Sequence, residues 1–442
     1  MRRIMPEYAY GPGPHQRCFW GASTLPGDPL SPAQGTIRSE FAVIGAGFTG
    51  LNAALRLAQA GHDVTVLEAE SPGWGASARN GGFCCLGGTA LSFKAIAKRH
   101  GEQGLKEWGA TEIAAIEQVR SFLTRTGTDA DIHSDGETIL AHSPAAMRDL
   151  RAEQAELETV YGVKTDLIEA EEMAAQGMRG RFFGALTLPN GFGLNPRKYA
   201  DGLARACLAA GVTIHGHSPV LSVRRDGEAF ALKTPGADVQ ADKVIFATNG
   251  YSSEDVPDWM RGRYMPLQSN VLVTRPLTPD EIRAGWGSDQ MAYTHQTFLN
   301  YFRLMPNGQF LFGMRGGLNS SPKVDAALHR RTRERFEAVF PDWAHVETPH
   351  CWNGILAFSA KRAPYVGPIP ELPGAYVGFA YHGNGVAMGS YAGALLADIA
   401  RGKDPDRLYP ALMRDIPGRF PLGRFRRVLM SPGYAYAALT GK

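Results

Sequence analysis

The sequence predicts an α/β protein with two parts: a doubly wound, Rossmann-like part built on a parallel sheet, and a part built on an antiparallel sheet. Three observations predict this fold class. A strand, a glycine-rich turn, a helix and a second strand follow one another within residues 41–68. Strand and helix patterns of the same style return in residues 193–258 and 351–405. Between them, residues 264–350 carry strand-like runs such as SNVLVTRPL, which are typical of an antiparallel sheet.

The first unit is predicted from hydrophobic periodicity. FAVI ends at Ile44 and reads as a strand buried on both faces. Apolar residues at helical spacing then run from Leu51 to Leu57, and DVTVLE supplies a second buried strand. The order strand, helix, strand makes this segment a βαβ unit.

Three glycines lie between the first strand and the helix. Gly45, Gly47 and Gly50 stand in G-x-G-x-x-G order, which provides a tight turn, close approach of a pyrophosphate to the backbone, and close packing of helix on strand. Glu68 ends the second strand about twenty residues later, where a carboxylate accepts hydrogen bonds from a ribose and repels a 2′-phosphate. The segment therefore predicts a dinucleotide site that disfavours NADP.

Composition narrows the class of protein. A chain of 442 residues with 44% apolar and 20% charged residues is long enough for two or three domains. Its 46 basic and 43 acidic residues nearly balance, so we expect no nucleic-acid partner. Five cysteines without metal-ligand spacing indicate reduced thiols and no metal site. Without a run of eighteen apolar residues or a signal-like N-terminus, we expect a cytoplasmic protein with no membrane partner.

The changes of pattern along the chain predict a discontinuous organisation. Residues 1–35 are rich in Pro and Gly and read as an N-terminal arm. The other predicted parts are the dinucleotide-binding domain (residues 36–90, 193–258 and 351–405), the substrate-binding domain (residues 91–192 and 259–350) and a C-terminal extension (residues 406–442).

The glycine motif alone does not separate NAD from FAD, because both cofactors present the same AMP half. A flavin reduced by NAD(P)H would require a second strand-GxGxxG-helix unit, and the sequence has none. HGNGVAMG, which begins at His382, instead places a helix N-terminus after a glycine turn. That arrangement supplies positive potential for a reduced flavin ring. The sequence thus favours FAD reduced directly by substrate.

These motifs resemble the D-amino-acid-oxidase-like family of FAD-dependent oxidoreductases over residues 36–402. WGASARNGG is similar to a loop of the γ-glutamylputrescine oxidoreductase subgroup and is more specific than the first glycine motif. ATNGY resembles the family's turn near the dinucleotide, and GFAYHGNGVAMG resembles its C-terminal flavin motif. The resemblance implies a two-domain flavoprotein.

The resemblance also implies which residues contact FAD. Relatives that tether FAD use a His after the second strand or a Cys before the last motif, and SPGWGASAR and FSAKRAPYVG contain neither, so a noncovalent flavin is implied. The implied cofactor-binding residues are Gly45, Gly47, Phe48, Thr49, Gly50, Glu68, Ala69, Gly75, Ala76, Ser77, Arg79, Asn80, Gly81, Gly82, Val220, Ala247, Thr248, Asn249, Gly250, Gly383, Asn384, Gly385 and Val386.

Four residues are candidates for contact with the substrate or the reacting atoms. Arg315 suits a substrate carboxylate, although a structural arginine fits equally. His382 is expected to cap the turn or contact FAD, with proton transfer as the lesser alternative. Tyr301 is a wall or core aromatic residue. Lys361 would assist oxygen reduction near the flavin N5 atom if it is not a surface lysine.

The predicted reaction is oxidation of a C–N bond in an amine or amino acid, by hydride transfer to flavin N5 and hydrolysis of the imine. The resemblance implies γ-glutamylputrescine as the first expected substrate. A glycine, sarcosine or D-amino-acid oxidase or dehydrogenase is the alternative, followed by a noncatalytic flavin protein. Oxygen or another acceptor would reoxidise the flavin, and no oligomeric state is indicated. For Cys84 and Cys85 we favour packing over a redox role.

Overall fold

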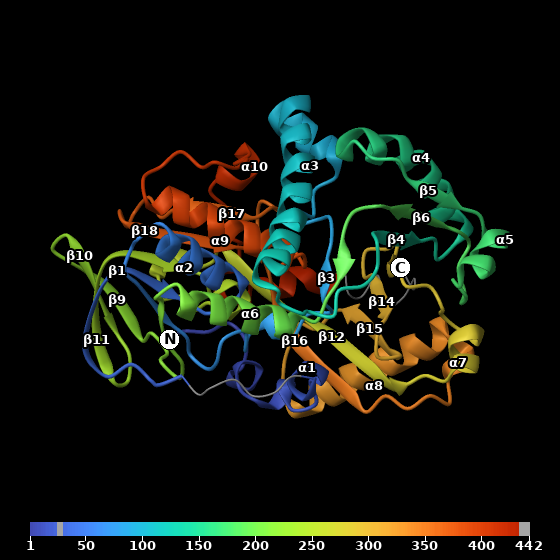
Figure 1. The fold of residues 1–442 in the computed structure, drawn as a ribbon, viewed down its shortest axis with the longest axis horizontal. Coiled ribbons are helices and arrows are strands. Elements are labelled where there is room, and N and C mark those ends of the chain that lie inside the picture. Colours follow the sequence, from blue (N-terminus) through green and yellow to red (C-terminus); the bar gives the residue numbers. More distant parts are fainter. Residues whose placement is uncertain (24–29, 433–442) are drawn as a thin grey trace.

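The computed structural model describes residues 1–23 and 30–432 (Figure 1). Residues 24–29 of the predicted N-terminal arm and residues 433–442 of the predicted C-terminal extension lie outside the described residues. The described residues contain two eight-stranded sheets and one two-stranded sheet. The long helix α3 (Phe93–Thr126) rises between the two lobes in the view of Figure 1.

The first sheet is mostly parallel. Its strands are β1 (Gly35–Ile44), β2 (Val64–Leu67), β8 (Thr213–His215), β9 (Ser222–Asp226), β10 (Ala229–Lys233), β11 (Ala237–Phe246), β17 (Tyr365–Pro368) and β18 (Ala375–Phe379). They follow the order β17-β18-β11-β1-β2-β8, and the hairpin β9–β10 extends from β11. The pairs from β18 to β8 are all parallel. This arrangement brings the carboxyl ends of β1, β2, β11 and β18 to one edge.

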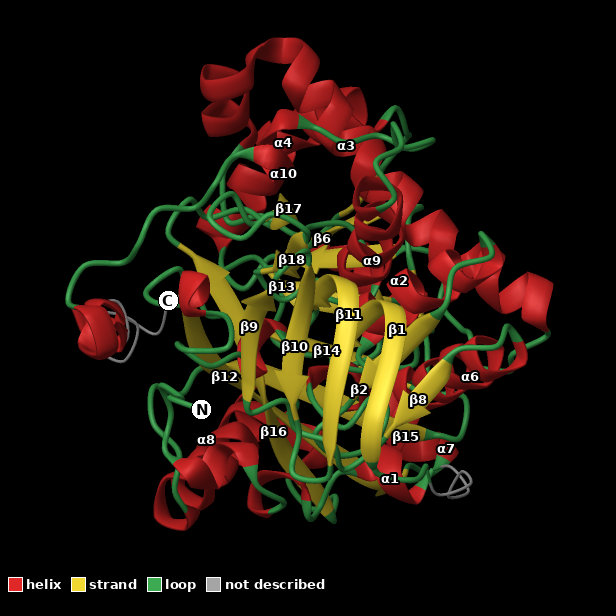
Figure 2. Cartoon of the chain, turned by 90° about the vertical axis from the view of Figure 1, so that its left-hand side faces the viewer, coloured by secondary structure: helices red, strands yellow, loops and turns green. Residues whose placement is uncertain are grey.

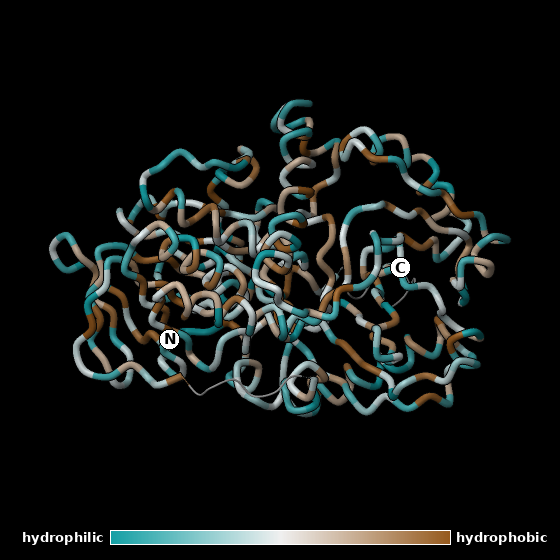
Figure 3. The backbone as a smooth tube through the Cα atoms, viewed as in Figure 1, coloured by the Kyte–Doolittle hydropathy of each residue, from teal (hydrophilic) through white to brown (hydrophobic). Residues whose placement is uncertain are grey.

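Burial explains why these segments form the centre of the sheet. Phe41, Ala42 and Val43 of β1 are fully buried, as expected for a strand covered on both faces. The helices α2 (Phe48–Gln59), α6 (Pro196–Ala209) and α9 (Ala387–Ala400) cover one face (Figure 2). Helix α2 contacts both α6 and α9. The outer tip of the β9–β10 hairpin and the far end of α3 are hydrophilic (Figure 3).

The second sheet is mostly antiparallel. Its strands are β4 (Glu137–Leu140), β5 (Asp166–Ile168), β6 (Ala185–Leu188), β12 (Tyr264–Pro276), β13 (Met291–Thr294), β14 (Asn300–Leu304), β15 (Gln309–Arg315) and β16 (His350–Ser359). Their order is β16-β12-β15-β14-β13-β4-β6-β5, with only the β13–β4 pair parallel. Helix α8 (Pro322–Val339) packs on β12, β15 and β16. The core beneath it is aromatic: the ring centroids of Phe310 and Trp343 lie 4.7 Å apart.

Strand β16 corrects one predicted boundary. We predicted that residues 351–405 belong with the first sheet, but β16 pairs along its whole length with β12 in the second sheet. Its residues largely alternate between buried and half-buried, which suits an antiparallel strand with two different faces. Within that range, β17, β18 and α9 do lie with the first sheet. Helix α3 is broken at Gly101.

The N-terminal arm packs on the body of the protein. Phe19 and Trp20 of α1 (Phe19–Ala22) share a hydrophobic cluster with Val271 and Trp352 of the second sheet. The arm therefore covers strands close to the dinucleotide-binding loop.

The remaining strands and α-helices are β3 (Phe83–Cys84), β7 (Phe192–Gly193), α4 (Pro144–Tyr161), α5 (Ala170–Met173), α7 (Pro279–Ala284) and α10 (Ala411–Arg414).

Within residues 1–23 and 30–432, no helix is both long enough and apolar enough to cross a membrane. The same described part of the chain holds no group of three or more His, Cys, Asp or Glu side chains placed to bind a metal ion.

A buried acid joins helix α3 to helix α4. The Tyr161 hydroxyl donates a hydrogen bond of 2.8 Å to Oε2 of Glu112, whose residue is 1% exposed. Burial raises the pKa of Glu112 to about 8, and the bond from Tyr161 offsets this only partly. The folded protein thus keeps the carboxyl protonated at pH values where the unfolded chain ionises it.

We expect Glu112→Gln to remove part of a pH-dependent loss of stability. From pH 4.5 to about 8 the folded state binds more protons at this position, so its contribution to stability falls as pH rises. Glutamine still accepts the Tyr161 bond and does not ionise. The melting temperature of the variant, followed by circular dichroism, should improve relative to wild type as pH rises through this range. Parallel curves for the two proteins would contradict the assignment.

Candidate active site

The turn between β1 and α2 requires glycine at three positions. Gly45 has a φ of 102°, in the region that favours glycine. A Cβ atom at Gly47 would lie 2.8 Å from Oγ of Ser77, and one at Gly50 would lie 1.8 Å from the Gly45 carbonyl oxygen. Ser77 Oγ accepts a 3.0 Å hydrogen bond from the Phe48 N–H at the start of α2. This open helix N-terminus has the shape that fits a pyrophosphate.

The carboxylate of Glu68 stands at the end of β2 beside this turn. Oε2 accepts a 2.7 Å hydrogen bond from the Ala46 N–H, and Oε1 accepts a 3.0 Å bond from the Glu70 N–H. Burial raises the pKa of Glu68, and the two backbone donors oppose that shift. The acceptor oxygens are thereby fixed at the edge of the cavity, as recognition of a ribose requires.

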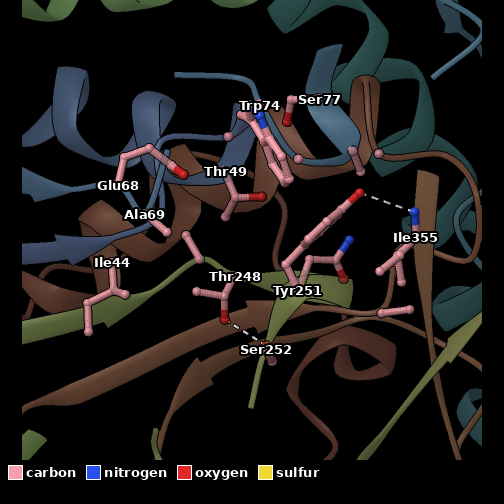
Figure 4. Close-up of a pocket in the computed structure, with 18 of the residues that line it drawn as sticks. Ile44, Thr49, Glu68, Ala69, Trp74, Ser77, Thr248, Tyr251, Ser252 and Ile355 are labelled. Atoms are coloured by element: carbon pink, nitrogen blue, oxygen red, sulfur yellow. Dashed lines mark hydrogen bonds between the residues drawn. The ribbon is translucent and has the colours of Figure 1, made fainter. Parts of the chain in front are cut away.

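A cavity runs along the turn at the carboxyl ends of the parallel strands (Figure 4). In Figure 4 the Tyr251 ring lies between Trp74 and Ile355, and the Ile355 N–H donates to its hydroxyl over 3.3 Å. The predicted cofactor residues that line this first cavity are Gly45, Gly47, Phe48, Thr49, Glu68, Ala69, Gly75, Ala76, Ser77, Asn80, Val220, Ala247, Thr248, Asn249, Gly383 and Gly385.

Seven predicted cofactor residues lie elsewhere. Of these, Gly50, Gly82 and Gly250 line neither the first cavity nor the one beside it. A Cβ atom at Gly82 would lie 2.0 Å from the Leu194 carbonyl oxygen, and one at Gly250 would lie 2.8 Å from that of Ile355. These glycines permit close packing of backbones. The other four line the adjoining cavity: Arg79, Gly81, Asn384 and Val386.

Sequence reasoning missed several residues of the first cavity. Tyr251 ends the ATNGY motif but was not named as a cofactor residue, and Ser252 and Ser253 follow it directly. Arg3 and Tyr10 come from the N-terminal arm, where the sequence has no periodic signal. Only the tertiary fold brings the arm to the cavity.

The loop at residues 79–81 lines a second cavity, and its Asn80 lines the first cavity as well. Three buried side chains donate to its consecutive carbonyl oxygens: Trp352 Nε1 to residue 79 over 2.8 Å, Trp20 Nε1 to residue 80 over 2.8 Å, and Arg303 Nε to residue 81 over 2.9 Å. These donors come from β16, the arm and β14. The loop is therefore held between the two sheets.

The second cavity brings together three of the four candidate catalytic residues: Tyr301, Arg315 and His382. The hydroxyl oxygens of Tyr301 and Ser269 lie 3.1 Å apart. Nη2 of Arg315 donates a hydrogen bond of 3.4 Å to the carbonyl oxygen of His382. The two cavities share Ala76, Asn80, Ile355, Leu356, His382 and Gly383. They meet at the glycine turn before α9.

Buried polar atoms at this junction indicate a polar ligand. His382 is 4% exposed, and its ring nitrogens make no hydrogen bond of standard geometry within the described chain, although the backbone of Ala363 acts weakly on the imidazole. Burial, with the nearby charge of Arg315, lowers the pKa of His382 to about 3, so the imidazole is neutral near pH 7. The two terminal nitrogens of buried Arg79 also lack partners among the described residues. These atoms and the glycine turn fit a flavin dinucleotide.

Lys361 does not lie in the second cavity with the other three candidate catalytic residues. It lines neither cavity, and its ammonium donates to the carbonyl oxygens of Leu412 and Asp415 over 2.7 and 2.6 Å. The turn after β16 points this side chain toward the segment around α10. Our prediction that Lys361 lies near the flavin therefore does not match its position.

The adjacent cysteines occupy different surroundings. Cys84 is fully buried in β3, whereas Cys85 lines the second cavity. Burial raises the pKa of both thiols, so neither is a thiolate at neutral pH. Cys84 fits the packing role that we favoured.

We expect Gly47→Val to abolish retention of FAD. The added side chain would occupy the space between α2 and Ser77 that a pyrophosphate needs. The measurement is the visible flavin absorbance of the purified protein relative to its protein absorbance. Gly418→Val is the matched control, because Gly418 is exposed and its Cβ would meet no atom within 4 Å. A Gly47 variant that purifies with full flavin content would refute the site.

Comparisons with known proteins agree with this geometry. Residues 40–399 match the DAO family, described as FAD dependent oxidoreductase. The chain is 29% identical to the "Probable oxidoreductase OrdL" of Rhizobium meliloti (strain 1021), over 95% of this chain and 96% of that protein. It is 28% identical to the "Gamma-glutamylputrescine oxidoreductase" of Escherichia coli (strain K12), over 96% of this chain and 98% of that one.

A solved structure shows the same fold. Glycine oxidase from Geobacillus kaustophilus superposes with a TM-score of 0.69 at 21% identity, covering 86% of this chain and 100% of that one. The family match confirms the expected FAD cofactor and an enzymatic oxidoreductase, and the superposition confirms the expected α/β fold class. The chain belongs to the DAO family of FAD-dependent oxidoreductases.

Proposed function

We propose that this enzyme oxidises the C–N bond of an amine or amino acid, with γ-glutamylputrescine as the first candidate substrate. A hydride would leave the carbon next to nitrogen, and water would hydrolyse the resulting imine. One observation carries the proposal: the dinucleotide cavity continues at His382 and Gly383 into a second cavity that Tyr301 and Arg315 line. A compact substrate there would lie beside the end of the cofactor.

The residues of the first cavity would hold FAD along its length. The N-terminus of α2 would bind the pyrophosphate, Glu68 the ribose, and the glycine turn before α9 the flavin ring. When bound, FAD supplies the hydride acceptor at N5. Because burial keeps the Cys85 thiol protonated, we propose that the cofactor is held noncovalently. We also propose that the first-sheet elements form the FAD domain and the second-sheet elements the substrate domain.

The protein side chains would position the substrate rather than attack it. Tyr301 packs edge-on against Phe83, with ring centroids 5.4 Å apart, and gives the second cavity an aromatic wall. His382 is uncharged near pH 7, which favours contact with the flavin over donation of a proton. Arg315 offers a guanidinium to a substrate carboxylate.

The relatives also support a finer proposal about cellular role. A "Gamma-glutamylputrescine oxidoreductase" aligns with nearly the whole chain. We therefore propose a part in polyamine catabolism in the cytoplasm, with oxygen or another acceptor reoxidising the cofactor.

Anaerobic mixing of the purified holoenzyme with a panel of amines tests the function. The panel contains γ-glutamylputrescine, butylamine, glycine, sarcosine and D-alanine, and the measurement is bleaching of the flavin absorbance. We expect γ-glutamylputrescine to bleach the flavin fastest. Bleaching by glycine or sarcosine alone would replace it with the amino-acid alternative. A flavin that no member reduces would count against amine oxidation.

Arg315 favours the amino-acid alternative as a second candidate, because a carboxylate needs such a partner in a cavity. If that alternative holds, Arg315→Gln should raise the KM for glycine about a hundredfold, the effect of losing two charge-assisted hydrogen bonds. The KM for butylamine, which has no carboxylate, should change little. Arg315→Lys should recover glycine binding only in part, since lysine lacks the planar fork. Equal effects on both substrates would assign Arg315 a structural role.

A further inference from the structure

The second cavity continues outward into a third. The two share Leu86, Gly87, Glu137 and Tyr293 as lining residues. Glu137 is the first residue of β4 and is only 2% exposed. Glu137 thus lines both the outer cavity and the chamber that Arg315 and His382 line.

We propose that Glu137 binds the ammonium group of the substrate and takes its proton, so that a neutral amine reaches the flavin. This proposal rests on the proposed amine oxidation and extends it. It gives a further catalytic role to a residue that the sequence did not single out.

The charged side chains that line the second cavity favour binding of an ammonium ion at Glu137. Among the described residues that line it, Glu137 is the one carboxyl group, while the cationic side chains are Arg79 and Arg315. A desolvated ammonium ion needs an anionic partner. The guanidinium groups repel it, and the neutral imidazole of His382 offers no charge. Glu137 is therefore the group that an ammonium ion entering this cavity would meet.

The lining of the outer cavity carries negative charge, which suits a cationic substrate. Its described lining includes the carboxyls of Glu137, Glu153 and Glu156 and contains no Lys or Arg. The basic side chain there is His295, whose Nε2 lies 3.2 Å from Oε2 of Glu153. The hydrogen bond with Glu153 raises the pKa of His295, so a protonated imidazole offsets one of the carboxylates and leaves Glu156 uncompensated among these residues. A passage lined by one sign of charge between low-dielectric walls concentrates ligands of the opposite sign. The outer cavity therefore favours cations.

The proton transfer balances without a further reactant. An N–H bond of the ammonium breaks, an O–H bond forms on Glu137, and no electrons leave either partner. The products are a neutral amine and a neutral carboxylic acid, and burial favours neutral forms over an ion pair. The nitrogen lone pair that hydride loss requires is then available.

The surroundings of Glu137 set its titration. Burial raises its pKa to about 8, while the Cys85 side chain and the Leu86 backbone oppose this. Several titratable and charged groups act on Glu137 or on its direct neighbours, and they come from five elements. They are Cys84 and Cys85 at β3, Glu112 of α3, Glu153 and Tyr161 of α4, Tyr293 of β13 and Arg315 of β15. The carboxylate that accepts the proton therefore becomes available as pH rises toward 8.

Binding of tert-butylamine to the FAD-loaded enzyme tests the ammonium site without turnover, because its carbon next to nitrogen carries no hydrogen. We compare wild type, Glu137→Gln and Glu112→Gln by isothermal titration calorimetry at about pH 9, where Glu137 is ionised. Glu112 is equally buried and has a similarly raised pKa but lines neither cavity. The dissociation constant should rise at least about tenfold in Glu137→Gln alone. Equal affinities in the three proteins, or no binding to wild type, would overturn the proposal.

The pH dependence of flavin reduction tests the proton transfer. With γ-glutamylputrescine under anaerobic conditions, the second-order rate constant for flavin reduction should rise with pH in wild type and Glu112→Gln, with its midpoint near pH 8. In Glu137→Gln this midpoint should move toward the pKa of the free amine, about 10. A midpoint that stays in place would refute the proton transfer. If no amine reduces wild type, amine oxidation fails, while the tert-butylamine comparison still decides whether Glu137 binds an ammonium ion.

Discussion

Both ligand cavities depend on the three hydrogen bonds that fix the carbonyl oxygens of residues 79–81. The donors, Trp20, Trp352 and Arg303, come from three distant parts of the chain and are almost completely buried. Burial lowers the pKa of the Arg303 guanidinium to about 9, which leaves it charged at neutral pH. A buried carbonyl that loses its donor costs about 1–3 kcal/mol. The position of this loop, which lines both cavities, is therefore set by the packing of the second sheet and the arm, not by the glycine loop alone.

The fixed loop also sets the electrostatic balance of the site. It carries Arg79, whose guanidinium carbon lies 4.0 Å from the centroid of the Trp74 ring. The N-terminus of α9 adds positive potential after the glycine turn. These groups suit the anionic charge of a reduced flavin. The same positive field would repel a substrate ammonium ion, and Glu137, once ionised, is the acidic group among the described lining residues that offsets it.

The sequence was informative where structure is local. The βαβ unit, the glycine turn and Glu68 lie within a short stretch, so spacing alone predicted the fold of residues 41–68 and most of the first cavity. Tyr301, Arg315 and His382, which were candidates from the sequence, line the second cavity together. Strand β16 was assigned to the wrong sheet because its partner β12 lies far away in the chain. Lys361 was misplaced because the direction of a side chain after a strand depends on tertiary contacts. Glu137 gave no signal, since a lone glutamate in an apolar strand is distinguished only by the cavities beside it.

The opposite charges of Arg315 and Glu137 bear on the choice between an amine and an amino acid. An amino acid would use both groups, its carboxylate on Arg315 and its ammonium on Glu137. An amine without a nearby carboxylate would use Glu137 alone and leave the guanidinium with its protein contacts, which include the His382 carbonyl oxygen. Arg315 is only half-buried, so the free energy lost when no carboxylate arrives is smaller than for a fully buried ion. A site of this kind requires the ammonium more strictly than the carboxylate, which is the order of preference that an amine oxidase needs and a strict amino-acid oxidase does not.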